Sequence, residues 1–267
     1  MTTILLLGLT VGIILALTGA GGGILAVPLL VFGAGLSMAE AGPIGLLAVG
    51  LAATLGAIMG LRSGIVRYKA AMLVASAGVL CSPLGLWLAQ RTPNRPLTIV
   101  FALVLLYVAF RVFQKSMPPA TQARANHPTP EPPCRLDSER GKLHWTAPCA
   151  RALAYSGAVA GALSGLLGVG GGFVMVPALQ RYTDLTTQSV VATSLAVIAL
   201  VSAAGVLAST AAGHLQWAVA LPFSGGALAG MLGGRLLAPK LAGPQLQKGF
   251  AVVSALVAVA LLVKAVG

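Results

Sequence analysis

Residues 19–28 read Gly-Ala-Gly-Gly-Gly-Ile-Leu-Ala-Val-Pro, and residues 168–177 read Gly-Val-Gly-Gly-Gly-Phe-Val-Met-Val-Pro. Both copies lie within strongly hydrophobic sequence. Glycine weakens a helix and frees the backbone to turn. In lipid, unwound backbone survives only where protein or a water-filled cavity surrounds it. The doubled motif therefore predicts a helix broken at membrane depth, once in each half of an internally repeated transporter.

The composition restricts the class of protein. Of the 267 residues, 57% are hydrophobic and 8% are charged, and the mean hydropathy is +0.94. A soluble domain cannot hide so much apolar surface, so we expect a polytopic membrane protein embedded in the lipid bilayer. The net charge of +12 comes from basic residues spread over loops beside apolar segments, which indicates topology signals and no nucleic-acid partner. No Lys or Arg precedes the first apolar run, so we expect no removable signal peptide.

The second half of the chain repeats the first without gaps, at a shift of 149 residues (168 − 19 = 149). The shift superimposes glycines and prolines, which mark backbone geometry rather than general hydrophobicity. The pairs include Gly12 with Gly161, Pro28 with Pro177, Gly56 with Gly205, Gly64 with Gly213, and Gly85 with Gly234. We therefore expect a duplication, with transmembrane repeat 1 over residues 1–115, a linker over 116–150 and transmembrane repeat 2 over 151–267.

The lengths of the apolar segments predict how each repeat crosses the membrane. A spanning helix needs about 20 apolar residues. The segments that reach or approach this length are 41–61, 70–90, 96–113, 189–212, 215–238 and 246–265. The pieces beside each glycine cluster are too short, whereas 4–36 is too long for one crossing. We predict an all-α protein of two inverted repeats of about four hydrophobic segments, in which the first segment is broken and re-entrant at a glycine-rich apex.

Loop charges support this topology. With re-entrant glycine segments, one side of the membrane receives Arg62, Arg67, Lys69, Arg111, Lys115, Arg151, Arg181, Arg235, Lys240 and Lys248. The other side receives only Arg91, Arg95 and Lys264. Glycine segments that cross once would divide the basic residues almost evenly. The positive-inside rule favours the first arrangement, with the linker in the cytoplasm and both termini outside.

The glycine clusters are the candidate binding site for a small anionic substrate. The half-helices from Ile24 and from Phe173 would present unpaired N–H groups and a positive dipole end, and inverted symmetry would bring both near the midplane. The predicted substrate-binding residues are Gly19, Gly21, Gly22, Gly23, Pro28, Gly168, Gly170, Gly171, Gly172, Pro177, Thr193 and Ser194. The alternative is that these glycines only let helices pack closely. Four glycines in five residues exceed what packing needs, which favours a binding site.

Hydroxyl side chains are the next candidates, because they can bind an oxyanion without burying a second charge. Thr193 and Ser194 are adjacent and near a helix start, while Thr18, Thr54, Ser164 and Ser202 lie at comparable depth. In each case the alternative is a local bond to a carbonyl of the same helix.

The charged side chains exclude several functions. No acid or base lies in the middle of a span, and we expect Glu40, Asp184 and His214 to be solvated loop residues. The negative cell interior expels an anion by about 2.3 kcal/mol per charge per 100 mV, so export needs no carboxylate relay, whereas uptake would need a coupling ion. Arg62 and Arg235 could attract anions, although topology anchoring is the favoured explanation. No nucleophile–base set or His-Glu pair is present, so we expect no enzyme, no cofactor and no metal site.

The proline-rich linker contains His127, Cys134, His144 and Cys149. These are residue types that zinc uses, but their spacings are irregular and lack close pairs. We therefore expect a reduced, solvated loop rather than a metal site.

The doubled Gly-x-Gly-Gly-Gly-x4-Pro, together with Ala192-Thr193-Ser194-Leu195 and Gly205, resembles the TauE/SafE family, the sulfite exporter family of membrane proteins. The resemblance covers nearly all of the chain outside the linker. It implies transport of sulfite or small organosulfonates across the bacterial inner membrane. Repeat 1 departs from the pattern, since Ile44-Gly45 stands where repeat 2 has Thr193-Ser194, and this would make the site lopsided.

These observations together predict a secondary transporter that exports a small sulfur-containing oxyanion by alternating access. The alternatives are uptake of a sulfur compound, transport of another ion such as a metal cation, and a membrane structural protein that transports nothing. The sequence leaves open whether the protein forms a homo-oligomer.

Overall fold

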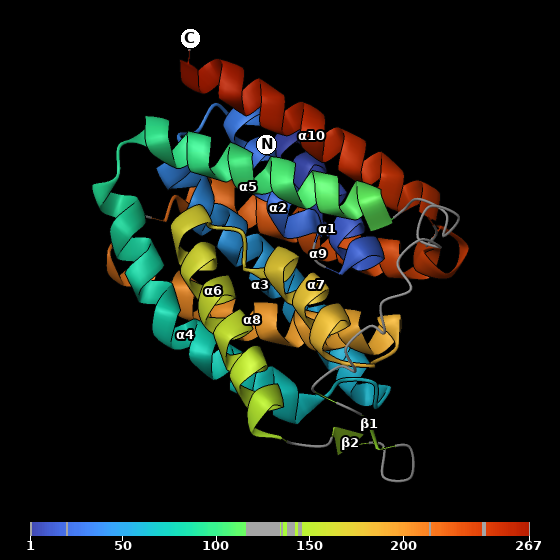
Figure 1. Cartoon of the computed structure of the whole chain (residues 1–267). Coiled ribbons are helices and arrows are strands. Elements are labelled where there is room, and N and C mark those ends of the chain that lie inside the picture. The colour runs from blue at the N-terminus through green and yellow to red at the C-terminus, as the bar shows by residue number, and fades with distance from the viewer. Residues whose placement is uncertain are drawn as a thin grey trace.

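The computed structural model describes residues 2–19, 21–115, 134, 136–137, 142–143, 146–213, 215–241 and 244–266. The first half contains α1 (Thr2–Thr18), α2 (Gly21–Gly33), α3 (Met38–Arg62), α4 (Tyr68–Arg91) and α5 (Asn94–Lys115). The second half contains α6 (Ala147–Leu167), α7 (Gly172–Tyr182), α8 (Thr187–Ala211), α9 (Trp217–Leu241) and α10 (Pro244–Val266) (Figure 1). Between them, β1 (Leu136–Asp137) and β2 (Lys142–Leu143) form a short antiparallel ribbon. The predicted helical membrane protein is confirmed.

In the described part of the chain, seven helices are long and apolar enough to cross a membrane. They are α3, α4, α5, α6, α8, α9 and α10, whereas α1 and α2 are shorter apolar helices. The prediction that both pieces beside each glycine cluster are too short to span is therefore wrong for α6. This helix has 21 residues because it begins at Ala147, inside the range expected to be linker. Thr146 caps its N-terminus by accepting a hydrogen bond from the amide of Cys149.

The first helix of each half packs on the fourth helix of the other half. A β-carbon placed on Gly12 of α1 would meet the carbonyl of Ala227 in α9, and one on Gly161 of α6 would meet the backbone of Gly78 in α4. Residue numbers rise together along both contacts, so each pair is parallel. Such close backbone approach through small residues is typical of helix pairs in membranes.

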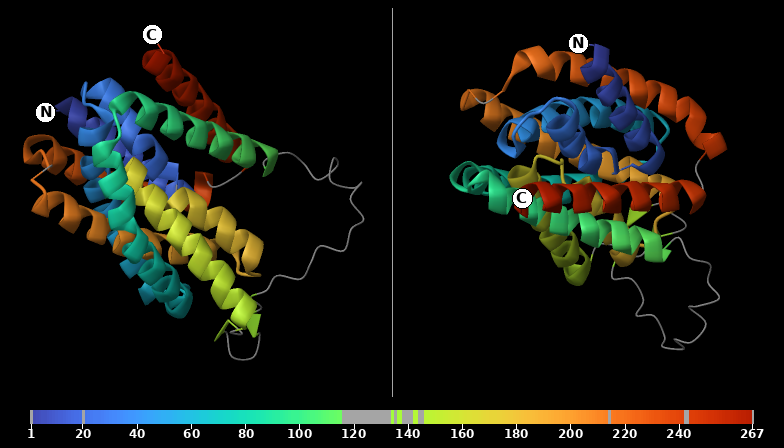
Figure 2. Two further views of the ribbon diagram at one scale, coloured as in Figure 1. Left: turned by 60° about the vertical axis from the view of Figure 1, so that its left-hand side comes forward. Right: turned by 90° about the horizontal axis from the view of Figure 1, so that it is seen from above.

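The third helices, α3 and α8, cross each other at the centre of the molecule. Gly50 lies beside Ser202, and Gly60 lies beside Ala192, so the two helices are antiparallel. The helices α5 and α10 also pack together, and they run in opposite directions along one side of the bundle (Figures 1 and 2). Antiparallel pairing of equivalent helices is the geometry expected of inverted repeats.

Equivalent contacts recur in the two halves at the shift of 149 residues. Gly19 contacts Val191, and its counterpart Gly168 contacts Gly42. Likewise, Gly56 lies against Leu195, and its counterpart Gly205 lies against Leu46. The duplication read from the sequence therefore extends to the contacts between the halves.

Different segments of the chain lie at the two ends of the bundle. At one end, the ammonium of Lys264 lies 5.3 Å from the ring of Phe32, so α10 ends beside the end of α2. At the other end, the amide of Arg67 donates to Oγ1 of Thr193, and Cys134 bonds to Cys149. We call these the terminal end and the linker end.

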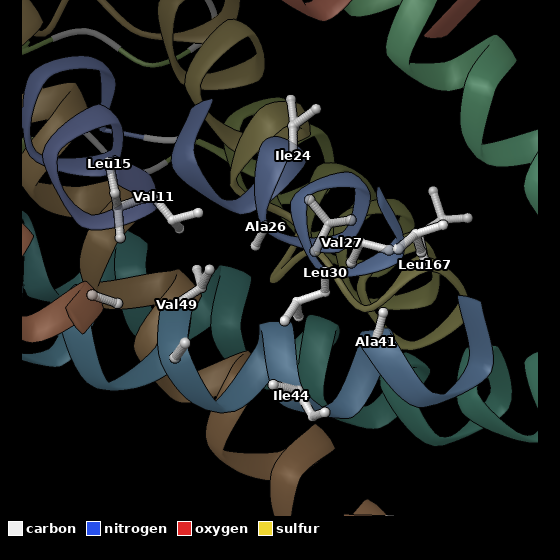
Figure 3. Packing of buried hydrophobic residues seen from close by; sticks show 14 of the residues in the cluster. Val11, Leu15, Ile24, Ala26, Val27, Leu30, Ala41, Ile44, Val49 and Leu167 are labelled. Atoms are coloured by element: carbon white, nitrogen blue, oxygen red, sulfur yellow. The ribbon is translucent and has the colours of Figure 1, made fainter. Parts of the chain in front are cut away.

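The hydrophobic core joins the two halves around α2 and α3. Figure 3 shows Leu30 of α2 and Ile44 of α3 in one buried cluster with Leu167 of α6. All of these side chains are less than 5% exposed. The core thus packs the first hairpin against the end of α6, where the second glycine cluster begins.

Replacement of Gly161 by Ala tests the close contact between α6 and α4. The new β-carbon would run into the backbone of Gly78, so we expect overpacking to lower stability by about 1 to 3 kcal/mol. Gly233→Ala in α9 is the control, because its β-carbon would enter open space. Thermal unfolding in detergent should show destabilisation of the first variant only, and equal unfolding temperatures would contradict this packing.

Candidate functional site

The first glycine cluster forms a helical hairpin. Helix α1 ends at Thr18, and Gly19 has a positive φ of 74°, which glycine adopts without strain. Helix α2 then returns along α1, so that Gly22 packs on Leu15 and Gly33 packs on Leu7. The predicted break is present, but α2 begins at Gly21 and not at Ile24. Glycine is needed within α2 because a side chain at Gly22 would collide with α1 and one at Gly23 would collide with Val169.

The second glycine cluster forms a wider turn. Helix α6 ends at Leu167, and Gly168, Gly170 and Gly171 have φ of 70°, 75° and 68°. A β-carbon in this left-handed region is unfavourable, so glycine is required by the backbone itself. Gly171 packs against Ala160 of α6, and α7 runs back from there. Gly22 occupies the same place beside Val11 in the first hairpin, at the expected shift.

The two turns meet in the buried centre. A β-carbon on Gly23 would strike the carbonyl of Val169, and one on Gly168 would strike the backbone of Gly42. Gly19, Gly22, Gly23 and residues 168–172 are all buried. The sequence correctly predicts that the two clusters approach each other. Close packing, the alternative reading of these glycines, is also visible at every one of these contacts.

The start of α7 has the properties of an anion site. Its N-cap is Gly171, which provides no side-chain hydrogen bond to the first turn. The first N–H groups of a helix have no intrahelical acceptor and carry a partial positive charge. A buried helix end without a side-chain cap can therefore accept the oxygens of a small anion.

The structure places the remaining predicted residues at different distances from this centre. Pro28 is buried inside α2, whereas Pro177 is exposed on α7, so the two prolines do not share an environment. Thr193 accepts a hydrogen bond of 3.1 Å from Arg67, and Ser194 donates one of 2.9 Å to the carbonyl of Val191. Both hydroxyls already have protein partners. They reach the first turn only through Val191, which contacts Gly19.

A cavity of about 160 Å³ lies beside the second turn. Its lining includes Gly42, Leu46, Gln90, Gly165 and Gly168, from α3, α4, α6 and the turn itself. The volume corresponds to roughly five water molecules at their share of about 30 Å³ in the liquid. The space is therefore sufficient for a small ion with part of its hydration shell.

Two charged side chains have environments that differ from those the sequence predicted. Glu40 is not a solvated loop residue: it caps α3 in a capping box with Ser37 and accepts a 2.8 Å hydrogen bond from Gln216. Arg235 reaches deeper than a helix end, since its guanidinium donates to the carbonyl of Gly56 at 3.0 Å. Asp184 is exposed, and His214 lies outside the described residues.

The cysteines of the linker contradict the expected reduced, solvated loop. Cys134 and Cys149 form a disulfide, and both are fully buried. Cys134 also donates its amide to the carbonyl of Tyr182, at the end of α7. The sequence could not show this pairing, because the spacing of two cysteines does not reveal which segments pack between them. His127 and His144 lie outside the described residues, which contain no cluster of three or more potential metal ligands.

Sequence reasoning missed Ser82 of α4. Its hydroxyl is buried and has no hydrogen-bond partner among the described residues, a property it shares with Ser164 and Ser202. Nothing in the local sequence distinguishes it from other small residues of α4. Its one sequence signal is the shift of 149, which pairs this serine with the apolar Met231.

A bundle of apolar helices with two buried glycine hairpins defines a polytopic membrane transporter. The family model "Sulfite exporter TauE/SafE" matches residues 4–261, so the chain belongs to the TauE/SafE family. A probable membrane transporter protein of Xylella fastidiosa (strain Temecula1) is 29% identical over 233 residues, covering 86% of this chain and 82% of the relative. The probable membrane transporter protein YunE of Bacillus subtilis is 26% identical over 244 residues, covering 87% and 85%. No solved structure matches the chain.

Replacement of Gly168 by Ala separates backbone strain from close packing at the second turn. Gly35 has nearly the same φ, 69° against 70°, but a β-carbon there meets nothing. We expect Gly35→Ala to cost about 1 kcal/mol of stability through strain alone. Gly168→Ala should cost about 1 to 3 kcal/mol more, because its β-carbon collides with Gly42. Thermal unfolding measures both, and equal losses would show that the contact with Gly42 is not tight.

Proposed function

We propose that this protein exports a small sulfur-containing oxyanion, such as sulfite or an organosulfonate, across the bacterial inner membrane. The observation that carries the proposal is the meeting of two buried glycine turns, one of which opens α7 without a side-chain cap. Amide donors at a helix start bind oxyanions through hydrogen bonds and the helix dipole. The name of the family adds sulfite as the first substrate to test.

In this proposal, each hairpin enters and leaves from one side, and the remaining six long helices cross the membrane. Such an inverted arrangement is consistent with the parallel packing of α1 on α9 and of α4 on α6. It is also consistent with the antiparallel packing of α3 on α8. Alternating access would then move one set of helices against the other around the central turns.

The direction follows from the charges. The described spans hold no acidic residue except Glu40, which is engaged as a helix cap. An outward anion flux is driven by the membrane potential alone, by about 2.3 kcal/mol per charge per 100 mV. Uptake of a sulfur compound would need a coupling ion and a group to hold it. Transport of a metal cation would need oxygen, thiol or thioether ligands, and a purely structural protein would show no flux.

Flux measurements test the proposed activity. Right-side-out vesicles loaded with sulfite should lose it faster when the interior is made negative, and one net charge per 100 mV corresponds to about a fiftyfold gradient at equilibrium. Gly171→Leu should abolish efflux, because the larger side chain fills the turn beside Ala160. Folded wild-type protein that moves none of sulfite, sulfate, methanesulfonate and thiosulfate would refute the proposal. Accumulation of sulfite inside the vesicles against the membrane potential would instead favour uptake as the direction of transport.

The orientation involves two opposing observations. Ten basic residues lie toward the linker end and three toward the terminal end, which favours a cytoplasmic linker by the positive-inside rule. A disulfide at the linker end is unusual in that reducing compartment. We give more weight to the charges, because many independent residues agree. The two sulfurs are bonded in the structure, and we propose that cytoplasmic reductants reduce this bond in the cell, which leaves Cys134 and Cys149 as a buried dithiol.

Thiol labelling decides the orientation. In a Cys81→Ser background, intact cells should not react with a membrane-impermeant maleimide. After denaturation without reductant, Cys134 and Cys149 should then both take up a polyethylene-glycol maleimide, which shifts the band on a gel. Labelling that requires prior reduction would place the linker on the oxidising side and reverse the proposed topology.

A further inference from the structure

Six buried serines depart from the usual hydrogen bonding of hydroxyl side chains in membrane helices. Thr54 and Ser156, for example, each donate to the carbonyl four residues earlier, at 2.7 Å. The hydroxyls without a partner among the described residues belong to Ser82, Ser164, Ser202, Ser209, Ser224 and Ser254. A buried polar group without a hydrogen bond is unfavourable and calls for an explanation, such as a missing ligand.

Ser202 points its hydroxyl at the second glycine turn. A β-carbon placed on Gly170 would lie 3.0 Å from Oγ of Ser202, and the serine is 0% exposed. On the opposite side, Ser202 packs on Gly50 of α3. The hydroxyl therefore lies between α8 and the second turn, beside Gly170, two residues before α7 begins.

Ser164 and Ser82 approach the same turn from two other helices. Ser164 lies one turn after Ala160 on α6, and Ala160 is the residue that packs on Gly171. Ser82 of α4 lies beside Gly205, which is one turn along α8 from Ser202, with Oγ 3.7 Å from the point where a β-carbon would stand. Ser202 thus faces the second turn directly, Ser164 lies on the helix that leads into it, and Ser82 lies beside Gly165 of that helix and Gly205 of α8.

Leu46 of α3 lies near both the cavity and this group of hydroxyls. Leu46 lines the cavity, as do Gly165 and Gly168. Its Cδ1 lies 3.1 Å from the β-carbon position of Gly205, next to the Ser82 hydroxyl. Leu46 therefore lies beside both the cavity and the Ser82 hydroxyl.

The first turn has no such group. The shift of 149 residues pairs Ser82 with Met231, Ser164 with Leu15, and Ser202 with Ala53. Each polar position around the second turn is apolar around the first. The side chains at these three equivalent positions therefore differ in chemistry between the two halves.

We propose that the second glycine turn is the oxyanion-binding subsite, in which the hydroxyls of Ser164 and Ser202 and the first amides of α7 bind the anion. This inference rests on the proposed function and assigns its substrate contact to one repeat. In this proposal the anion contacts Ser164 and Ser202 and not Thr193 and Ser194. The hydroxyls of Thr193 and Ser194 already have protein partners.

Single substitutions test the subsite in the full-length protein. The probe is sulfite, with chloride as the salt control, and the readouts are the sulfite-dependent rise in unfolding temperature and the concentration dependence of efflux. Ser202→Ala should raise the half-saturating sulfite concentration at least about tenfold, the usual effect of losing a hydrogen bond to a charged group. Ser254→Ala is the matched control, because Ser254 is equally buried and unpartnered but lies in α10.

The outcomes separate this inference from the proposed function. If wild-type protein binds and moves sulfite but Ser202→Ala behaves like Ser254→Ala, the proposed subsite is refuted and the proposed transport function is retained. If wild type neither binds nor moves any tested oxyanion, the proposed function itself fails. Should Ser202→Ala not fold, Ser164→Ala serves as the second test, and an unchanged half-saturating concentration would overturn the subsite.

Discussion

Direct contact between the backbones of neighbouring segments is the constraint on which this structure depends. Gly168 lies against Gly42, Gly161 against Gly78, and Gly12 against the carbonyl of Ala227. Within a bilayer, apolar side chains gain little by leaving lipid for protein, so helices associate through tight van der Waals packing. Glycine makes that packing possible because no side chain keeps the backbones apart.

The same constraint couples the two hairpins to the crossing helices. Each glycine turn is held by the third helix of the opposite repeat, through Gly19 on Val191 and Gly168 on Gly42. A hairpin cannot shift without displacing α3 or α8, or losing this contact. The proposed alternating access would use such contacts, since packed interfaces switch between discrete arrangements rather than deform smoothly.

Several errors of the sequence reading share one physical cause. Glycines 21–23 read as a break, yet they form the first turn of α2, in which a side chain at Gly22 would collide with α1 and one at Gly23 with Val169. The length of α6 was hidden by a proline and an arginine near its start, although proline is well accommodated in a first helical turn. Cys134 looked solvated because its segment is polar, whereas it is buried against α6 and α7. In each case a neighbouring segment overrode the local composition.

Composition and the lengths of the apolar segments sufficed to predict a helical membrane protein, and the glycine clusters predicted its two helix breaks, because these signals are local along the chain. They could not tell which hydroxyls lack partners. Thr193, the stronger candidate by position, is bonded to Arg67, while Ser202 faces Gly170 without a partner among the described residues. That distinction arises only when α8 meets the second hairpin, since a hydroxyl's hydrogen bond depends on its rotamer and on the helix opposite it.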